Sequence, residues 1–112
     1  MVEPGLMLTK PRQPSKATLK RYGLTLEDWT GMMKAQAWVC AICKKIPASG
    51  GLTIDHEHVY RWRYKPPERR KLYVRGVVCS YCNRVVLRKG MTVDKLKAAI
   101  KYLEAYEKRR PA

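Results

Sequence analysis

The sequence predicts a small α+β domain in which a few short strands are flanked by helices at both ends of the chain. Apolar residues recur at helical spacing in residues 25–37 and again after residue 92. Two short apolar runs, at residues 52–54 and 74–78, have the length of strands. The chain has 112 residues, so one small core is expected, and a bound metal or a cross-link would help to stabilise it.

The N-terminal segment is expected to form an arm followed by a short helix. Residues 1–14 carry prolines among basic residues, which predicts a flexible basic arm, and residues 15–110 are then a single domain. Ser15 is a suitable N-cap for a helix that ends before Gly23.

A second helix is predicted to begin after Thr25. Asp28 follows three residues later and can complete a capping box with Thr25. Trp29, Met32 and Met33 then follow at helical spacing. We interpret these three apolar side chains as core residues.

The middle of the chain is predicted to hold two strands joined by a basic segment. The first strand covers residues 52–54 and ends at Asp55, after a Gly-Gly turn. Residues 61–75 are rich in arginine and aromatic residues and are expected to form a loop or hairpin. The second strand covers residues 74–78.

Two helices are predicted to close the chain. Ser80 can cap a helix that runs to about Arg88, and Thr92 can cap the last one. The last helix carries an apolar stripe, which is expected to pack against another surface. The residues of this stripe are Val93, Leu96, Ile100 and Leu103.

The charge of the chain indicates a polyanionic partner. Its formal net charge of +15 favours nucleic acid through the release of condensed counterions, although ribosomal and membrane-surface proteins share this trait. No apolar run is long enough to span a membrane, and the first ten residues do not resemble a signal peptide. A cytoplasmic protein without a membrane partner is therefore expected, in a compartment where paired cysteines bind metal more often than they form disulfides.

The four cysteines form two C-x2-C pairs, Cys40 with Cys43 and Cys79 with Cys82. This spacing lets both sulfurs of a pair reach one cation, and two pairs complete a tetrahedral Zn²⁺ site. Four thiolates leave no open position, so this zinc would be structural. Disulfides or free thiols are the alternative, and a redox role has no βαβ pattern to support it.

Both histidines of the chain lie in the motif Asp55-His56-Glu57-His58. On a strand, alternation places Asp55 and Glu57 on one side and the two histidines on the other. Hydrolysis of a phosphodiester needs an activated water and a cation on the phosphate. Asp55 offers hard oxygen ligands to Mg²⁺, and a neutral His56 can take a proton from water. The motif alone also fits an exposed polar turn.

Asn83 directly follows the last cysteine. A zinc ion at Cys82 would fix the start of this helix and bring Asn83 near Asp55. Its amide oxygen is a hard ligand that could complete a cation site without adding charge. Alone, Asn83 would equally suit a helix surface or a cap.

The segment after His58 carries cations interleaved with Trp62, Tyr64 and Tyr73. Cations can neutralise phosphates, and aromatic rings can stack on exposed bases or sugars, so DNA contact is expected. A solvated basic hairpin with a few packed aromatic rings is the alternative. The cations concerned are Arg61, Arg63, Lys65, Arg69, Arg70, Lys71 and Arg75.

The order of these motifs resembles that of a known family. The strings C-A-I-C, I-D-H-E-H and V-R-G-V-V-C-S-Y-C-N resemble the phage recombination endonuclease VII family, a branch of the HNH (ββα-metal, His-Me finger) nucleases. The helix before the first cysteine pair and the closing helix are also similar, so the resemblance covers residues 15–106.

The resemblance implies a zinc-stapled ββα-metal (HNH) core with flanking N- and C-terminal helices. It implies that Cys40, Cys43, Cys79 and Cys82 bind structural zinc. It implies further that Asp55 and Asn83 hold a catalytic Mg²⁺ or Mn²⁺, that His56 is the general base, and that His58 contacts or supports the phosphate.

These observations lead us to expect a metal-dependent DNA endonuclease that resolves branched DNA such as Holliday junctions or nicks DNA. A homodimer is expected, because a junction needs two symmetric cuts. If the chain is phage-encoded, it would act in the cytoplasm of the bacterial host. The alternatives are a non-catalytic zinc module that binds nucleic acid and a ribosomal-type RNA-binding protein, neither of which needs Asp55, His56 and Asn83.

Overall fold

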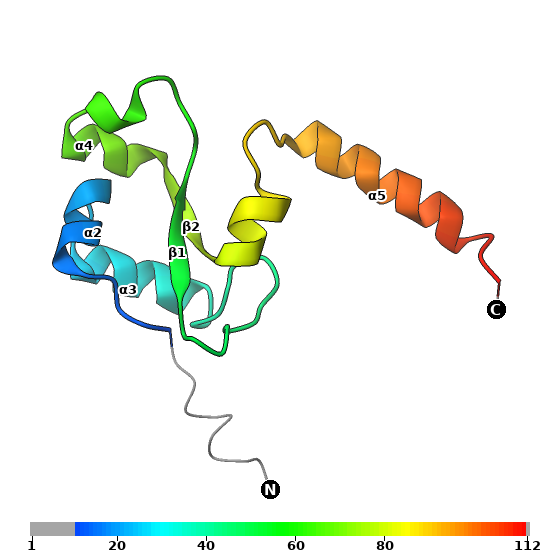
Figure 1. Ribbon diagram of the computed structural model, residues 1–112, viewed down its shortest axis with the longest axis horizontal. Coiled ribbons are helices and arrows are strands. Elements are labelled where there is room, and N and C mark those ends of the chain that lie inside the picture. The colour runs from blue at the N-terminus through cyan, green and yellow to red at the C-terminus, as the bar shows by residue number, and fades with distance from the viewer. Residues whose placement is uncertain (1–10, 112) are drawn as a thin grey trace, which may run out of the picture.

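Two antiparallel strands form the centre of the molecule, and helices lie on either side of them (Figure 1). The structure, a computed structural model, describes residues 11–111. Strand β1 (Leu52–His56) pairs with β2 (Val74–Cys79), and the register is interrupted by a bulge between Asp55 and His56. The predicted α+β class is therefore confirmed as a mixture of helices with a small two-stranded sheet.

Two N-terminal helices, α2 (Lys16–Tyr22) and α3 (Leu26–Ala35), begin at the predicted caps. The Ser15 hydroxyl accepts a hydrogen bond from the Thr18 amide at 3.1 Å. Thr25 and Asp28 form the reciprocal capping box, with hydrogen bonds of 3.0 and 2.8 Å. These caps satisfy amide donors that a helix start leaves without partners.

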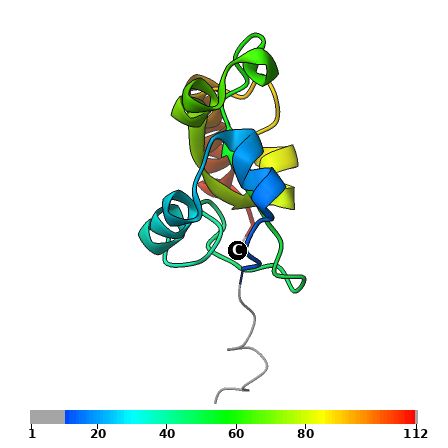
Figure 2. The same ribbon diagram turned by 90° about the vertical axis from the view of Figure 1, so that its left-hand side faces the viewer.

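The main core lies between these helices and the sheet. Trp29 and Met33 of α3 are buried, as the sequence predicts, and Met33 is fully buried. Leu19, Leu24, Ile54 and Val77 complete the cluster. Figure 2, viewed from the side of α2, shows α2 in front of the strands and α5 behind them.

Gln36 ties the end of α3 to the outer edge of β2. Its amide nitrogen donates to the Val77 carbonyl at 2.8 Å, and its amide oxygen accepts from the Val77 N–H at 2.9 Å. The side chain therefore satisfies both backbone groups, as a third strand would. A Cβ atom at the neighbouring Gly76 would lie 3.0 Å from that amide oxygen, which explains the glycine there.

The segment between the strands consists of short helical turns, so the predicted loop or hairpin is wrong in detail. They are η1 (Trp62–Tyr64), α4 (Pro67–Arg70) and η2 (Lys71–Tyr73). Pro66 and Pro67 lack N–H donors and have a fixed φ, which suits the first turn of a helix and not a hairpin. Trp62, the first residue of η1, is buried.

After β2 the chain turns into a π-helical segment, η3 (Cys82–Val86), which lies across the strands from α2 (Figure 1). The predicted cap by Ser80 is wrong. The Cys79 sulfur accepts the Cys82 N–H at 3.4 Å, and the Ser80 hydroxyl accepts a hydrogen bond from Arg84 instead. The sulfur of Cys79, a residue of the second C-x2-C pair, therefore takes the capping role that was expected of the Ser80 hydroxyl.

The last helix, α5 (Val93–Glu107), begins at Thr92 as predicted, because the Thr92 hydroxyl accepts the Lys95 amide at 3.1 Å. None of its residues is buried in the described part of the chain, and it extends away from the strands (Figure 1). Of its apolar stripe, Val93, Ile100 and Leu103 are exposed and Leu96 is half-buried, so the expected packing is largely absent within residues 11–111.

The ends of the described chain bear on the predicted domain boundary. Most of the expected arm, residues 1–10, lies outside the described residues. The Arg12 amide donates to the Gly50 carbonyl at 2.7 Å, so residue 12 is bonded to the segment before β1. Among residues 11–111, no helix combines the length and the apolar character needed to cross a membrane.

Candidate active site and metal centre

The four cysteines, two from each C-x2-C pair, come together in the structure. Their sulfur atoms all lie within 4.8 Å of one another, and the Cys43 and Cys79 sulfurs are 3.8 Å apart. Zinc–sulfur bonds of about 2.3 Å in a tetrahedron place neighbouring sulfurs about 3.8 Å apart. Both the donor set and the spacing therefore fit Zn²⁺.

Backbone N–H groups point at these sulfurs and stabilise negative charge on them. The amides of Ile42 and Cys79 donate to the Cys40 sulfur at 3.4 and 3.3 Å. Burial acts to raise the pKa of Cys40, but backbone hydrogen bonds outweigh it and lower the pKa to about 6. Burial and the neighbouring thiols raise the pKa of Cys82 to about 12. One thiolate is thus favoured in the cluster, and a divalent cation would favour the others.

Among residues 11–111, Asp55 is the buried acidic residue, with 3% of its surface exposed. Ile54 packs with α2 and α3, so alternation along β1 turns Asp55 to the other face of the sheet. There its carboxylate accepts two hydrogen bonds from Arg75, from Nε at 2.7 Å and from a terminal nitrogen at 3.0 Å. These hydrogen bonds raise the pKa of Arg75, which remains charged.

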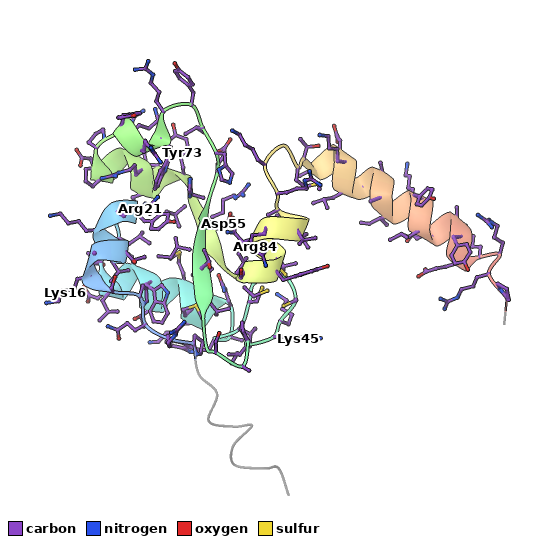
Figure 3. The ribbon with its side chains drawn as sticks, in the orientation of Figure 1. Lys16, Arg21, Lys45, Asp55, Tyr73 and Arg84 are labelled. Carbon is purple, nitrogen blue, oxygen red and sulfur yellow. The ribbon has the colours of Figure 1, made fainter. Side chains whose placement is uncertain are left out.

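Asn83 lies on η3, on the side of the sheet that Asp55 faces. It is half-buried and follows Cys82, whose side chain belongs to the cysteine cluster. Figure 3 shows Asp55 on β1 between Arg21 on α2 and Arg84 on η3. The two predicted oxygen ligands thus lie on β1 and on η3, and η3 begins at Cys82 of the cysteine cluster.

His56 lies in an aromatic stack at the end of β1. Its ring is 3.9 Å from that of Trp62 with an interplanar angle of 20°, and the Tyr22 ring is 5.6 Å away. The His58 ring is 4.9 Å from that of His56, as expected for two histidines on one side of the chain. Burial, followed by the nearby charge of His58, lowers the pKa of His56 below its ordinary value. The imidazole is therefore neutral at pH 7 and can accept a proton.

An open cavity of about 580 Å³ lies in front of the two histidines. The cavity is lined by Trp62 and Arg63 of η1 and by Arg61, which precedes η1. The other basic side chains that line the cavity are Arg21 and Lys89. Sequence reasoning missed these last two residues, because they come from the end of α2 and from the segment after η3. Basic residues at a helix end are common, so only the tertiary structure reveals their place at this cavity.

The seven cations predicted to contact DNA have different surroundings in the structure. Arg61 and Arg63 line the cavity, but Arg75 pairs with Asp55. Lys71 forms an ion pair of 3.3 Å with Asp28, and the Arg70 guanidinium lies 5.7 Å from the Trp62 ring centre. Two side chains remain: Lys65 lies over the Tyr73 ring, and Arg69 is exposed on α4.

Comparisons with known proteins bear on the identity of this site. The profile of the recombination endonuclease VII family matches residues 15–105. The Gene 59 protein of Mycobacterium phage D29 is 30% identical over 89 residues, with 76% of this chain and 46% of that protein covered. The chain thus spans less than half the length of this curated relative. No solved structure matches the chain.

Proposed function

The chain belongs to the recombination endonuclease VII family, and from this premise we propose that it is a metal-dependent DNA endonuclease of the HNH type. The observation that carries the proposal is His56, which lies beside the buried Asp55 and opens on a cavity lined by basic side chains. A neutral base, a carboxylate and phosphate-binding cations are the groups that phosphodiester hydrolysis requires. Two strands followed by the helical segment η3 also suit a ββα-metal core.

We assign the catalytic cation to Asp55 and Asn83. Carboxylate and amide oxygens are the hard donors that Mg²⁺ and Mn²⁺ prefer, so the donor set fits either ion. A bound Mg²⁺ or Mn²⁺ would neutralise charge that develops on the scissile phosphate. The four cysteines would hold a separate, structural zinc ion that fixes η3, and with it Asn83.

His56 is the proposed general base. Its lowered pKa keeps the imidazole unprotonated at neutral pH, so it can accept the proton of an attacking water molecule. Stacking on Trp62 fixes the plane of the ring, and the Trp62 indole N–H is anchored on the Arg70 carbonyl at 3.3 Å. His58, whose ring lies next to that of His56, would support the phosphate.

The side chains around the cavity would hold the DNA backbone. Arg21, Arg61, Arg63 and Lys89 converge on the cavity from separate segments and offer positive charge to phosphates. Tyr64 also lines the cavity and is 75% exposed, so it can stack on an unpaired base. These contacts depend on the shape and the unpaired bases of DNA, which favours branched or distorted DNA over plain duplex. Holliday junctions are such a substrate, and nicking of duplex DNA is the other mode to test.

Resolution of a four-way junction requires two incisions, so we propose that the chain acts as a homodimer. The apolar stripe of α5 supports this proposal, because most of it is exposed within the described chain. In cells, a phage-encoded enzyme of this kind would meet its DNA in the host cytoplasm.

A cleavage assay tests the function directly. The zinc-loaded protein is incubated with a labelled four-way junction and with matched duplexes, nicked and intact, in Mg²⁺, in Mn²⁺ and in chelator. We expect cleavage that depends on the added cation and is fastest on the junction. Absence of cleavage from every substrate in both cations would refute the proposal.

The His56→Ala variant links the assay to the site. We expect its cleavage rate to fall by about 10²–10⁴-fold, the usual contribution of a general base, with folding and DNA affinity retained. Lys97→Ala, an exposed substitution on α5, serves as the matched control and is expected to cut at the unaltered rate. Cleavage by a folded His56→Ala protein at the same rate as the control would remove His56 from the mechanism.

A further inference from the structure

The contact between Asp55 and Arg75 joins a buried group to one that reaches the surface. Only 3% of the Asp55 side chain is exposed, against 43% of the Arg75 side chain. Arg75 contacts both carboxylate oxygens, at 2.7 and 3.0 Å. This is the fork geometry in which a guanidinium binds a carboxylate most strongly.

The bulge in the sheet creates this contact. Asp55 is opposite Gly76 and His56 is opposite Val74, so Arg75 is the extra residue of β2 and has no partner in β1. A bulged residue is turned out of the regular alternation, which re-aims its side chain.

The guanidinium and a divalent cation would compete for the same carboxylate. A buried carboxylate is costly unless a cation is paired with it, and Arg75 fills that need. A divalent ion on Asp55 would lie within a few ångströms of the guanidinium. Two cations at that separation repel each other strongly in a partly buried site. Asp55 therefore binds each of them more weakly when the other is present.

We propose that Arg75 is a resident counter-cation of Asp55 that moves to a DNA phosphate when DNA binds, so that divalent-cation binding depends on DNA. This inference rests on the proposed function, since it takes Asp55 as a cation ligand. The exposed and flexible stem of Arg75 allows the guanidinium to leave the carboxylate. By linkage, DNA would then increase cation affinity and the cation would increase DNA affinity by the same factor.

Binding of Mn²⁺ to the zinc-loaded full chain in the absence of DNA provides the first test. Free Mn²⁺ is followed by its paramagnetic resonance signal, and folding of each variant is checked by circular dichroism. We expect Arg75→Gln to bind Mn²⁺ about tenfold more tightly, because the competing charge is gone. Arg88→Gln is the matched control, since it is exposed and removes the same charge, and we expect its affinity to be unchanged.

The direction of the change decides between two roles. Weaker Mn²⁺ binding by Arg75→Gln would mean that Arg75 orients Asp55 for the cation, and unchanged binding would mean that Arg75 does not compete with the cation. Either result would overturn the proposal. Arg75→Lys keeps the charge without the fork, so we expect a gain smaller than that of Arg75→Gln. It remains informative if the glutamine variant does not fold.

Dependence on DNA provides the second test, in a His56→Ala background that prevents cleavage. We expect a four-way junction to tighten Mn²⁺ binding about tenfold when residue 75 is arginine and to have little effect when it is glutamine. Equal effects of DNA in both proteins would overturn the coupling. Cleavage of DNA without this coupling would leave the proposed function standing. An Asp55→Asn variant that binds Mn²⁺ as well as the unaltered protein would instead overturn both the proposed cation site and this inference.

Discussion

Helices α3 and α5 share two local features but lie in opposite environments. Each is amphipathic and each begins at a threonine whose hydroxyl accepts an amide hydrogen bond three residues later. Helix α3 buries Trp29 and Met33 against the sheet, whereas α5 buries no residue within the described chain. On α5, Ile100 has 54% and Leu103 has 57% of its surface exposed.

The difference shows what an amphipathic pattern establishes. The pattern and the cap are local properties, so they predict that a helix forms and which face is apolar. They do not predict which surface covers that face. Helix α3 leads through Gln36 onto the edge of β2, which holds the helix against the core. Helix α5 follows the turn at Gly90 and leaves the body of the protein, so its apolar face is available to another molecule.

Loss of the zinc site should produce the largest difference in behaviour between α3 and α5. Cys79→Ser removes a buried sulfur from the cluster that lies next to the main core. Structural zinc contributes about 10–16 kcal/mol of apparent binding free energy in small zinc domains, so we expect the body to unfold. Hydrogen exchange should then show lost protection of the α3 amides, while those of α5, an exposed helix, exchange rapidly before and after the change.

Metal analysis provides the control for this experiment, with about one zinc expected per unaltered chain. A folded Cys79→Ser protein that lacks zinc and keeps the protection of its α3 amides would contradict the structural role of zinc. It would also contradict the expected difference between α3 and α5.

Truncation of one apolar side chain on each helix should give the next largest difference. Met33→Ala removes a fully buried side chain and should lower the free energy of unfolding by about 2–5 kcal/mol. Ile100→Ala removes an exposed one and should change it by less than about 0.5 kcal/mol. Urea unfolding at low protein concentration and saturating zinc measures both. A loss at Ile100 equal to that at Met33 would show that α5 packs on the body in solution.

The parts of the fold that were predictable from sequence depend on neighbouring residues. The caps at Ser15, Thr25 and Thr92 are satisfied within three residues, and the C-x2-C spacing itself brings two sulfurs together. The two strands were also located correctly, with β1 ending one residue beyond Asp55. The helical turns between the strands were missed because arginine-rich segments have no strong period, although Pro66 and Pro67 offered a signal.

The candidate site was less predictable because it is assembled from remote segments. Asp55 and His56 could be proposed from their motif, and the structure places them on adjacent positions at the end of β1. The partnership of Asp55 with Arg75 depends on a bulge that the sequence does not reveal, and Arg21 reaches the cavity only through the packing of α2. Trp62 belongs to the segment predicted to contact DNA, but its own side chain is buried against His56.

Removal of the two caps should produce a smaller contrast of the same kind. Thr25→Ala leaves the Asp28 amide without its acceptor at the start of a packed helix, and should lower the free energy of unfolding by about 0.5–2 kcal/mol. Thr92→Ala removes the equivalent bond from α5 and should reduce helicity by circular dichroism without a change in that free energy. An equal loss of stability in the two variants would mean that α5 unfolds together with the body.

The smallest effect on folding is expected for a change that should have a large effect on assembly. Val93, Leu96, Ile100 and Leu103 are spaced alternately by three and four residues, which is the spacing of helices that pair along a seam. A second copy of α5 could cover this stripe.

Ile100→Asp combined with Leu103→Asp should therefore change the unfolding free energy of the monomer by less than about 0.5 kcal/mol. The same change should convert a homodimer into a monomer, measured by light scattering at micromolar concentration with and without a four-way junction. The matched control is Lys97→Asp combined with Lys101→Asp, which places the same residues outside the stripe and should remain dimeric. With a monomeric variant, nicked DNA should still be cut, but the two incisions that resolve a junction should no longer occur together. If the unaltered protein is monomeric under both conditions, α5 does not pair, and a nicking enzyme is left as the interpretation of this site.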